Sequence, residues 1–443
     1  MSDIKFNYST IDDIKNKISE LGLENLPLSE DVSVLKDEVI IGNIRVPNRI
    51  AIQPMEGCDG TVEGEPDELT LRRYDRFAES GAGLVWVEAV AIVNEGRANP
   101  RQLYINEKTV DSLKRMNERI RELSMKKNGY APVIIMQATH SGRYSKPEGT
   151  PAPLIAYNNP IFEKDNPIDK SRIISDDKLF ELEEMYGKAA KMAEEAGFDG
   201  IDIKCCHRYL NSELLSAYNR EGAFGGSFEN RTRLLRNGIK NATDATGKDF
   251  IITTRMNVYD GFEYPYGWGV KENCGKDIDL SEPIKLIDIL HNQLSVKMID
   301  VTIGNPYFNP FVNRPADATA EFFGEHPLIG VDRMFGCVGA IQKAFPNLAV
   351  MGSGVSYMRQ YSGNLAAGAI KNGMMTMQGF GREAFAYPQF ANDLLYKGEM
   401  DKNMCCITCA KCTELMRAGT VAGCVIRDNE VYMPIYKQYC MNK

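Results

Sequence analysis

Long apolar runs are missing from this sequence, and no run approaches the length needed to span a membrane. The first residues, Met1-Ser2-Asp3-Ile4-Lys5, lack the apolar core of a signal peptide. An excess of basic residues is also missing, because 52 Lys and Arg face 60 Asp and Glu and the net charge is −8. A general nucleic-acid binder would carry a basic face. These absences predict a protein that works neither in a membrane nor on nucleic acid.

A dinucleotide-binding fingerprint is missing too. No G-x-G-x-x-G follows a predicted strand, and the run Gly352-Ser353-Gly354-Val355-Ser356-Tyr357 fails at its third glycine. We find no internal repeat beyond an alternation of strands and helices, and no low-complexity tract. With 43% apolar and 25% charged residues, the composition is that of an ordinary globular protein.

Cysteine, in contrast, is concentrated near the end of the chain. Five of the eleven cysteines fall within residues 405–424, as Cys405, Cys406, Cys409, Cys412 and Cys424. Two-residue spacings put several thiolates within reach of one soft metal centre. Zinc ribbons usually pair two C-x2-C knuckles, so three close cysteines and a distant fourth favour a [4Fe–4S] cluster over zinc or free thiols. We expect Cys406, Cys409, Cys412 and Cys424 as ligands, with Cys405 as the rival for the first position.

The thiols also indicate a compartment. An oxidising environment would tend to pair eleven cysteines as disulfides, so we expect a cytoplasmic, reducing location. A clustered iron–sulfur site further suggests a low-oxygen lifestyle.

Short, nearly all-apolar runs alternate with amphipathic helices between residues 39 and 400, as expected of parallel strands buried on both faces. One such helix is predicted over Asp176–Ala196, with Gly197 as its stop. Eight strands with intervening helices are the count of a (β/α)8 TIM barrel, with a doubly wound sheet as the rival. The predicted strands are Arg49–Gln53, Gly83–Glu88, Val133–Gln137, Gly200–Lys204, Phe250–Met256, Met298–Thr302, Ala349–Gly352 and Met374–Met377.

Around this α/β barrel we predict two additions. Residues 1–38 form a charged, helical N-terminal extension, residues 39–400 the barrel, and residues 401–443 a segment that holds the cluster. Long connections at 139–172, 257–279 and 304–326 are predicted at the C-terminal mouth, where barrel enzymes place their active sites. Their aromatic runs at 264–268 and 307–311 form either a lid over a flat substrate or simple loop packing.

Two glycine-containing turns indicate a phosphate site. Gly352, Ser353 and Gly354 follow the seventh predicted strand, and the run Gly379-Phe380-Gly381-Arg382 follows the eighth and opens a helix. Glycines let backbone N–H groups approach a phosphate, and the loops after strands seven and eight are the usual phosphate site of such barrels. Arg382 adds a charged fork.

Other strand ends carry polar side chains. Gln137, Lys204 and Arg255 end the third, fourth and fifth predicted strands, where an unpartnered cation would be costly. A flavin offers a partner, because its pyrimidine edge gains negative charge on reduction. The alternative is a buried ion pair with Glu88 or Asp202.

In combination, these motifs resemble the old yellow enzyme family over about residues 40–430. The similar segments are Asn48-Arg49-Ile50 through Pro54-Met55, the run from Gln137 to Arg143, the run from Phe198 to Lys204, Tyr209-Leu210, and Glu229-Asn230-Arg231. With the C-terminal cysteines, the chain looks like the branch of 2,4-dienoyl-CoA reductases and 2-enoate reductases, to which trimethylamine dehydrogenase is related. Those enzymes use FMN and a [4Fe–4S] cluster.

The resemblance implies roles for individual residues. Tyr209 is implied as the proton donor to an alkene that receives hydride, a task suited to a well-placed phenol. FMN contacts are implied for Pro54, Met55, Gln137, Arg255, Gly354, Gly381 and Arg382, and the glycine turn described above adds Gly352 and Ser353 as expected cofactor contacts.

Several positions depart from the family pattern. Lys204 and His207 stand where relatives often hold a substrate carbonyl with His or Asn, and Arg208 replaces a common glycine, which adds a cation beside the active site. Glu56 occupies the place of a small or thiol residue near the flavin. The histidine of dienoyl-CoA reductases after strand six is absent, which disfavours dienoyl-CoA as substrate. The cluster spacing has two residues, rather than three, between the second and third ligands.

We therefore expect an FMN-dependent ene-reductase of α,β-unsaturated carbonyl or carboxylate substrates that receives electrons through the cluster. Relatives append a FAD and NAD(P)H domain after the cluster, whereas Lys443 follows Cys424 by nineteen residues. Electrons should then come from a separate flavoprotein or ferredoxin-like donor. An FMN and [4Fe–4S] amine-type dehydrogenase and a non-catalytic electron-transfer subunit are the alternatives. We leave open a homo-oligomer.

Overall fold

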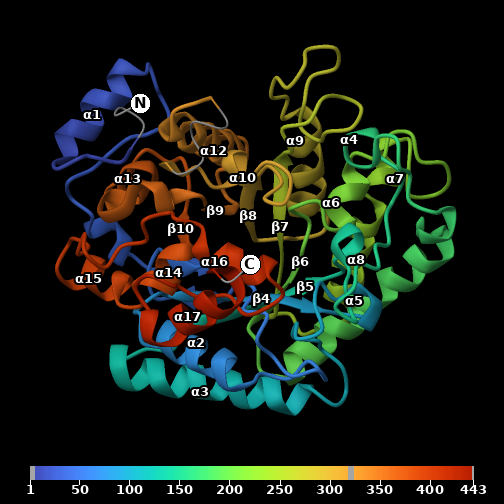
Figure 1. Cartoon of the computed structure of the whole chain (residues 1–443), viewed down its shortest axis with the longest axis horizontal. Coiled ribbons are helices and arrows are strands. Elements are labelled where there is room, and N and C mark those ends of the chain that lie inside the picture. Colours follow the sequence, from blue (N-terminus) through green and yellow to red (C-terminus); the bar gives the residue numbers. More distant parts are fainter. Residues whose placement is uncertain (1–4, 318–323, 442–443) are drawn as a thin grey trace.

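Eight parallel strands close into a barrel in the computed structural model, which describes residues 5–317 and 324–441 (Figure 1). Neighbours around the barrel follow the order β10, β3, β4, β5, β6, β7, β8, β9, and β9 pairs with β10. The predicted (β/α)8 TIM barrel is confirmed and the doubly wound alternative is wrong. The strands are β3 Ile50–Ile52, β4 Leu84–Ala91, β5 Val133–Thr139, β6 Gly200–Ile203, β7 Ile251–Tyr259, β8 Met298–Ile303, β9 Ala349–Gly352 and β10 Met377–Phe380.

Helices cover the outside of this barrel. The predicted helix at Asp176–Ala196 is confirmed as α5, whose N-cap Ser175 accepts a hydrogen bond from the backbone of Lys178. The main helices are α2 Glu68–Ala78, α3 Val110–Asn128, α5 Asp176–Glu195, α8 Arg233–Ala245, α9 Ser281–Asp288, α12 Pro327–Ala344, α13 Ser362–Lys371 and α15 Phe390–Tyr396. Short helices are α4 Pro160–Glu163, α6 Leu210–Leu215, α7 Phe228–Arg231, α10 Pro310–Asn313 and α14 Arg382–Ala386. Within the described ranges, no helix combines the length and the apolar character that crossing a membrane requires.

The inner face of the barrel changes from apolar to polar along the strands. Near their N-terminal ends, Trp86, Ile135 and Met298 belong to one buried apolar cluster. Because alternate residues of a strand share a face, the next inward position after Ile135 is Gln137, and after Met298 it is Asp300. A polar layer therefore lies above an apolar base.

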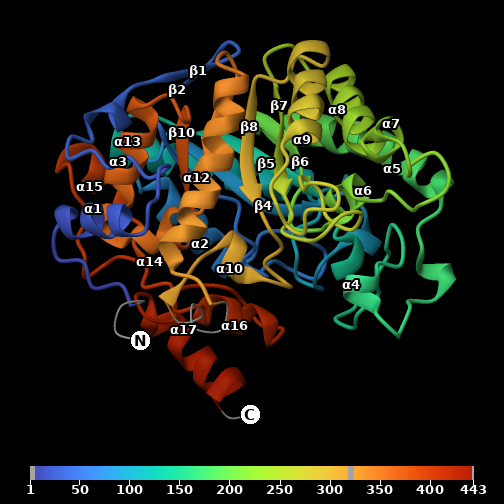
Figure 2. The ribbon, with the colours of Figure 1, turned by 90° about the horizontal axis from the view of Figure 1, so that it is seen from above.

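A small hairpin that the sequence analysis missed covers the apolar base. Strands β1 Val39–Ile41 and β2 Ile44–Val46 pair antiparallel across a two-residue turn of Gly42 and Asn43. Gly42 has φ +61°, as such tight turns require. The N-terminal extension before it contains α1 Ile11–Glu20 with a capping box at Thr10. Figure 2 shows β1 and β2 at one end of the barrel, with the C-terminal helices at the other.

The eighth strand starts three residues later than predicted. Met374 and Met375 resemble a strand start because they are apolar, but Met374 N donates to Ala369 O in the turn that ends α13. Met375 packs in the core. As a result Gly379 and Phe380 lie inside β10 rather than after it, and Gly381 alone forms the turn before α14.

The C-terminal segment folds back over the barrel mouth. It contains α16 Lys411–Arg417 and α17 Asn429–Tyr436, which share a small apolar core around Leu415 and Tyr432. Ala422 N donates to Gly57 O at 2.7 Å just after β3. Arg72 on α2 binds both carboxylate oxygens of Asp428, at 2.7 and 2.9 Å.

Candidate active site

A cavity opens where the carboxyl ends of the strands meet the C-terminal segment, and we call it the mouth cavity. Most of the predicted cofactor and catalytic residues line it, although they are spread from residue 54 to residue 382. Its described lining is Gln53, Pro54, Met55, Glu56, Gln137, Lys204, His207, Tyr209, Arg255, Pro306, Tyr307, Asn313, Arg314, Ser353, Gly354, Ser356, Gly381, Arg382, Phe385, Cys412, Thr413, Met416, Arg417 and Ala422.

Asp202 organises the floor of the mouth cavity. Its carboxylate accepts hydrogen bonds from Gln137 Nε2 at 2.6 Å, Trp86 Nε1 at 2.9 Å and the backbone N of Arg255 at 2.7 Å. Burial raises the pKa of Asp202 to about 6, while these donors oppose the increase. The network fixes the Gln137 amide at the cavity wall.

Arg255 is held by a second buried carboxylate. Its Nε lies 2.8 Å from Asp300 Oδ2, and Gln53 Nε2 donates to Asp300 Oδ1 at 3.2 Å. Burial raises the pKa of Asp300 to about 7, and the Arg255 charge acts in the opposite direction. The ion-pair alternative named the wrong acids, because Asp300 pairs with Arg255 and Glu88 pairs with Arg73 on α2.

Tyr209 joins residues from three strand ends. Its hydroxyl donates to Glu56 Oε1 at 2.9 Å, after β3, and lies 2.8 Å from the Tyr307 hydroxyl, after β8. Lys204 Nζ, after β6, lies 3.6 Å from the centre of the Tyr209 ring and 3.8 Å from Glu56 Oε1. Burial and then the Glu56 charge raise the pKa of Tyr209 well above its ordinary value. The phenol is therefore neutral throughout the usual assay range.

His207 and Arg208 diverge, although they are adjacent in sequence. Both have left-handed backbones, with φ +63° and +60°, a conformation that favours glycine. His207 lines the mouth cavity, and burial lowers its pKa well below the ordinary value, so its imidazole is neutral. Arg208 is fully buried outside the cavity, where its Nη1 lies 2.9 Å from Asp260 Oδ2. The structure does not bring Arg208 together with the other predicted catalytic residues.

The predicted phosphate end is only partly assembled as expected. Ser353, Gly354, Gly381 and Arg382 line the cavity. Gly352 does not, because it is the last residue of β9 and its carbonyl accepts a hydrogen bond from Gln378 Nε2 at 3.2 Å.

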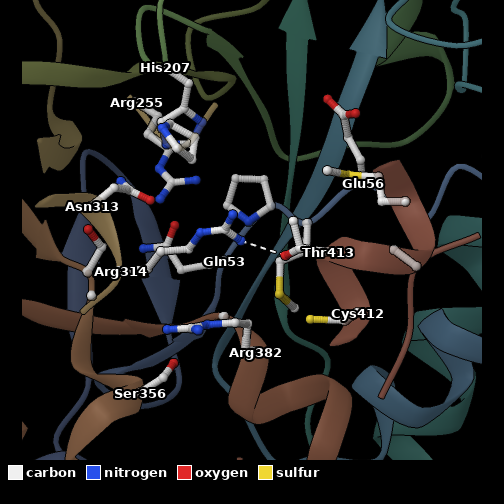
Figure 3. Close-up of a pocket in the computed structure, with 18 of the residues that line it drawn as sticks. Gln53, Glu56, His207, Arg255, Asn313, Arg314, Ser356, Arg382, Cys412 and Thr413 are labelled. Atoms are coloured by element: carbon white, nitrogen blue, oxygen red, sulfur yellow. Dashed lines mark hydrogen bonds between the residues drawn. The ribbon is translucent and has the colours of Figure 1, made fainter. Parts of the chain in front are cut away.

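Arg314 was missed from the sequence. Figure 3 shows its side chain extending across the cavity to Thr413 on α16, and Arg314 Nη1 donates to Thr413 Oγ1 at 2.7 Å. Burial and the nearby Arg382 lower the pKa of Arg314 to about 10. The position of an arginine in a predicted mouth loop was the signal that could have identified it.

The aromatic loops mainly pack against each other. Trp268 and Phe311 are buried away from the cavity, and Phe308 packs edge-on against Phe162 and Phe262. Tyr307 alone from these runs lines the cavity within the described residues. Part of the 304–326 connection lies outside the described residues.

A second, smaller cavity adjoins the first, and we call it the cysteine cavity. All four predicted cluster ligands line it, whereas Cys405 does not. Its described lining is Arg382, Phe385, Cys406, Ile407, Cys409, Ala410, Cys412, Cys424, Val425, Ile426 and Arg427. Arg382, Phe385 and Cys412 line both cavities.

The backbone around these cysteines donates toward sulfur. Thr408 N donates to Cys406 Sγ at 3.4 Å, and Arg427 N donates to Cys424 Sγ at 3.3 Å. Cys405 instead donates to Asp401 O at 3.3 Å. In residues 5–317 and 324–441, no group of three or more His, Cys, Asp or Glu side chains converges as ligands of one metal ion would.

Comparison with known proteins gives a consistent family. The NADH:flavin oxidoreductase / NADH oxidase family matches residues 38–297. A curated relative, the NADPH dehydrogenase of Clostridium acetobutylicum, is 30% identical over 267 residues, which are 60% of this chain and 72% of that protein.

Two solved structures share the fold at low identity. A 2-naphthoyl-CoA reductase in complex with 2-naphthoyl-CoA is 19% identical with a TM-score of 0.73, covering 89% of this chain and 57% of that one. The histamine dehydrogenase of Rhizobium sp. 4-9 is 19% identical with a TM-score of 0.69, covering 90% and 52%. The chain thus spans little more than half the length of either.

Proposed function

Because the chain belongs to the NADH:flavin oxidoreductase / NADH oxidase family, we propose that it is an FMN-dependent reductase of electron-poor C=C bonds with a neighbouring [4Fe–4S] cluster. The observation that carries the proposal is the buried Tyr209 hydroxyl at the mouth cavity, bonded to Glu56. When bound, FMN supplies the hydride for the β-carbon of the alkene. Tyr209 supplies the proton for the α-carbon.

The lining of the mouth cavity fits FMN. Gln53 Oε1 and His207 Nε2 are buried without a hydrogen-bond partner among the described residues, so both are available to a bound molecule. Arg255 supplies positive charge for the isoalloxazine and Arg382 for the phosphate. Gly354 brings the backbone to the cavity in a left-handed conformation, with φ +81°.

The cysteine cavity fits a [4Fe–4S] cluster. Four thiols surround it, and N–H groups directed at cysteine sulfur are among the features that tune such clusters. Because Cys412 and Arg382 line both cavities, electrons would have a short path between the cofactors.

The charge of the mouth cavity favours an unsaturated carbonyl or carboxylate as substrate. Its described lining has five cationic side chains and one carboxylate, which repels an amine substrate in its ammonium form. Neutral His207 and the Lys204 side chain, whose pKa is lowered by burial, are placed to hold a carbonyl oxygen. The amine-type dehydrogenase is therefore the weaker candidate, and a non-catalytic subunit would not need Tyr209.

The test is an anaerobic half-reaction assay. Purified protein is analysed for flavin and iron, reduced, and mixed separately with a 2-enoate, a neutral cyclic enone and a primary amine. We expect one FMN and about four irons per chain, with reoxidation by enoate and enone. Flavin reduction by the amine without reoxidation by either alkene would overturn the proposal.

The electron donor is tested in the same preparation. We propose delivery by a separate flavoprotein or ferredoxin-like donor through the cluster. NADH and NADPH are therefore compared with a reduced ferredoxin, because the curated relative is called an NADPH dehydrogenase. Rapid direct oxidation of NAD(P)H by this chain would make the protein donor unnecessary.

A further inference from the structure

The single proton of the Tyr209 hydroxyl points to Glu56 rather than into open space. Tyr209 donates to Glu56 Oε1 at 2.9 Å, and a phenol has one proton to give. In the 2.8 Å contact between the two tyrosines, Tyr307 is then the donor and Tyr209 the acceptor. Tyr209 thus receives one hydrogen bond and passes its own proton toward a carboxylate.

A buried acid that gives its proton to a substrate must recover one. Tyr209 is 1% exposed, whereas the Glu56 side chain is 12% exposed. Among the described residues that line the mouth cavity, Glu56 is the one carboxylate. Glu56 is therefore the more exposed member of the pair, and it is a carboxylate through which a solvent proton can reach the phenol.

We propose that Glu56 is the proton-relay partner that reloads Tyr209, with Tyr307 holding the phenol in place. This inference rests on the proposed function, in which Tyr209 protonates the substrate. The Tyr209 O–H bond breaks as a C–H bond forms on the substrate, which leaves a phenolate. The Glu56 carboxylate then takes up a proton from solvent, and the new Glu56 O–H bond breaks as the Tyr209 O–H bond re-forms. The relay carries protons only, so both residues end each turnover unchanged.

The groups around the pair suit this exchange. Lys204 faces both members, at 3.8 Å from Glu56 Oε1 and 3.6 Å from the centre of the Tyr209 ring, and it stabilises a transient phenolate. Tyr144 stacks on Tyr307 at 4.1 Å and fixes that ring. Burial, and then the charge of Glu56, raises the pKa of the Cys58 thiol well above its ordinary value, so Cys58 stays neutral.

Titration of Tyr209 itself tests the coupling without any substrate. Tyrosine labelled with 13C at Cζ is incorporated, and Tyr209→Phe identifies the Tyr209 signal. Glu56→Gln should move the titration of this signal to lower pH, because the phenolate no longer faces a carboxylate. Tyr307→Phe is the matched control, because it removes a neutral neighbour and leaves the Glu56 carboxylate in place, so the titration should move less than in Glu56→Gln.

The second measurement is the rate at which reduced enzyme is reoxidised by a cyclic enone across pH. Glu56→Gln should slow it by roughly 10²-fold, the lower end for a positioned acid. Glu56→Asp should restore part of the rate. Flavin content and circular dichroism confirm that each variant is folded.

Two results would overturn the relay. In one, the Tyr209 signal titrates at the same pH in Glu56→Gln and the parent protein; in the other, Glu56→Gln reduces the enone at the parent rate at every pH. A different result would show that the proposed function itself is wrong. Tyr209→Phe would then be as fast as the parent while the NMR coupling to Glu56 persists, and the relay would fall with it.

Discussion

The mouth cavity and the cysteine cavity are neighbours built in opposite ways. The mouth cavity gathers residues from the strand ends, the loops that follow them and the C-terminal segment, between residues 53 and 422. The cysteine cavity takes almost all of its lining from residues 406–427. The first exists only when the barrel is closed. The cysteine cavity needs little more than one short segment of the chain to fold.

Their chemistry differs as well. The mouth cavity places cations above a floor of buried carboxylates, and Asp202 and Asp300 have raised pKa values, chiefly because of burial. The cysteine cavity is formed by thiols, apolar side chains and two arginines. A charged organic cofactor suits the first and a soft metal cluster the second. Arg382, Phe385 and Cys412 form the boundary between them.

The largest effect is expected for a residue that lines the cysteine cavity but not the mouth cavity. Cys406→Ser should abolish the iron content, because one of the four proposed ligands is lost, while the proposed FMN remains in a cavity that Cys406 does not line. Cys405→Ser is the matched control and should keep its iron. Iron, sulfide and flavin analyses of anaerobically purified variants measure both. Iron retained in Cys406→Ser but lost in Cys405→Ser would reverse the ligand assignment.

Tyr209→Phe addresses the mouth cavity alone. It should slow alkene reduction by roughly 10²–10⁴-fold, the usual worth of a positioned general acid. FMN and iron contents should not change, because the ring and its packing remain. Stopped-flow reoxidation by an enone measures the effect, and flavin reduction by dithionite is the control. A variant as fast as the parent would remove Tyr209 from the mechanism.

The same contrast explains what could be predicted from sequence. The barrel followed from eight apolar runs, and local spacing singled out four cysteines that line one cavity, whose role as cluster ligands stays a prediction. The predicted strand ends placed Gln137, Lys204 and Arg255 at the barrel mouth, because the carboxyl ends of parallel strands lie at the same end of a barrel. Their partners were not predictable, since Asp300 lies on β8 and Glu56 follows β3, and no local pattern links either to Arg255 or Lys204.

Two further errors have physical reasons. Arg314 reaches the cavity from a loop, and no local pattern shows that it extends to Thr413. The start of β10 was misplaced because apolar Met374 and Met375 serve the core without joining the sheet. Sequence patterns report burial well, but they do not report which buried residues pair.

Arg208 lies outside the mouth cavity, and its substitution tests this placement. Arg208→Met should lower the free energy of unfolding by about 3–5 kcal/mol, because it leaves Asp260 buried without its ion pair. Urea unfolding measures this. Lys204→Met is the contrasting variant, with a smaller loss of stability and a raised KM for a carboxylate substrate. A stable Arg208→Met with a raised KM for the enoate alone would return Arg208 to the substrate site.

Arg382 lines both cavities, and its substitution should give the smallest effect. As one charged donor to the proposed FMN phosphate, it is worth about 1.5–3 kcal/mol, so Arg382→Met should weaken FMN binding by about 10–100-fold. Titration of the flavin-stripped protein measures the Kd, and Arg427→Met is the matched control because it lines only the cysteine cavity. Riboflavin lacks the phosphate, so its affinity should be the same in both variants and the parent. If Arg382→Met weakened riboflavin as much as FMN, Arg382 would shape the cavity rather than bind phosphate. If Arg382→Met caused loss of iron instead, Arg382 would support the cysteine cavity rather than the FMN phosphate.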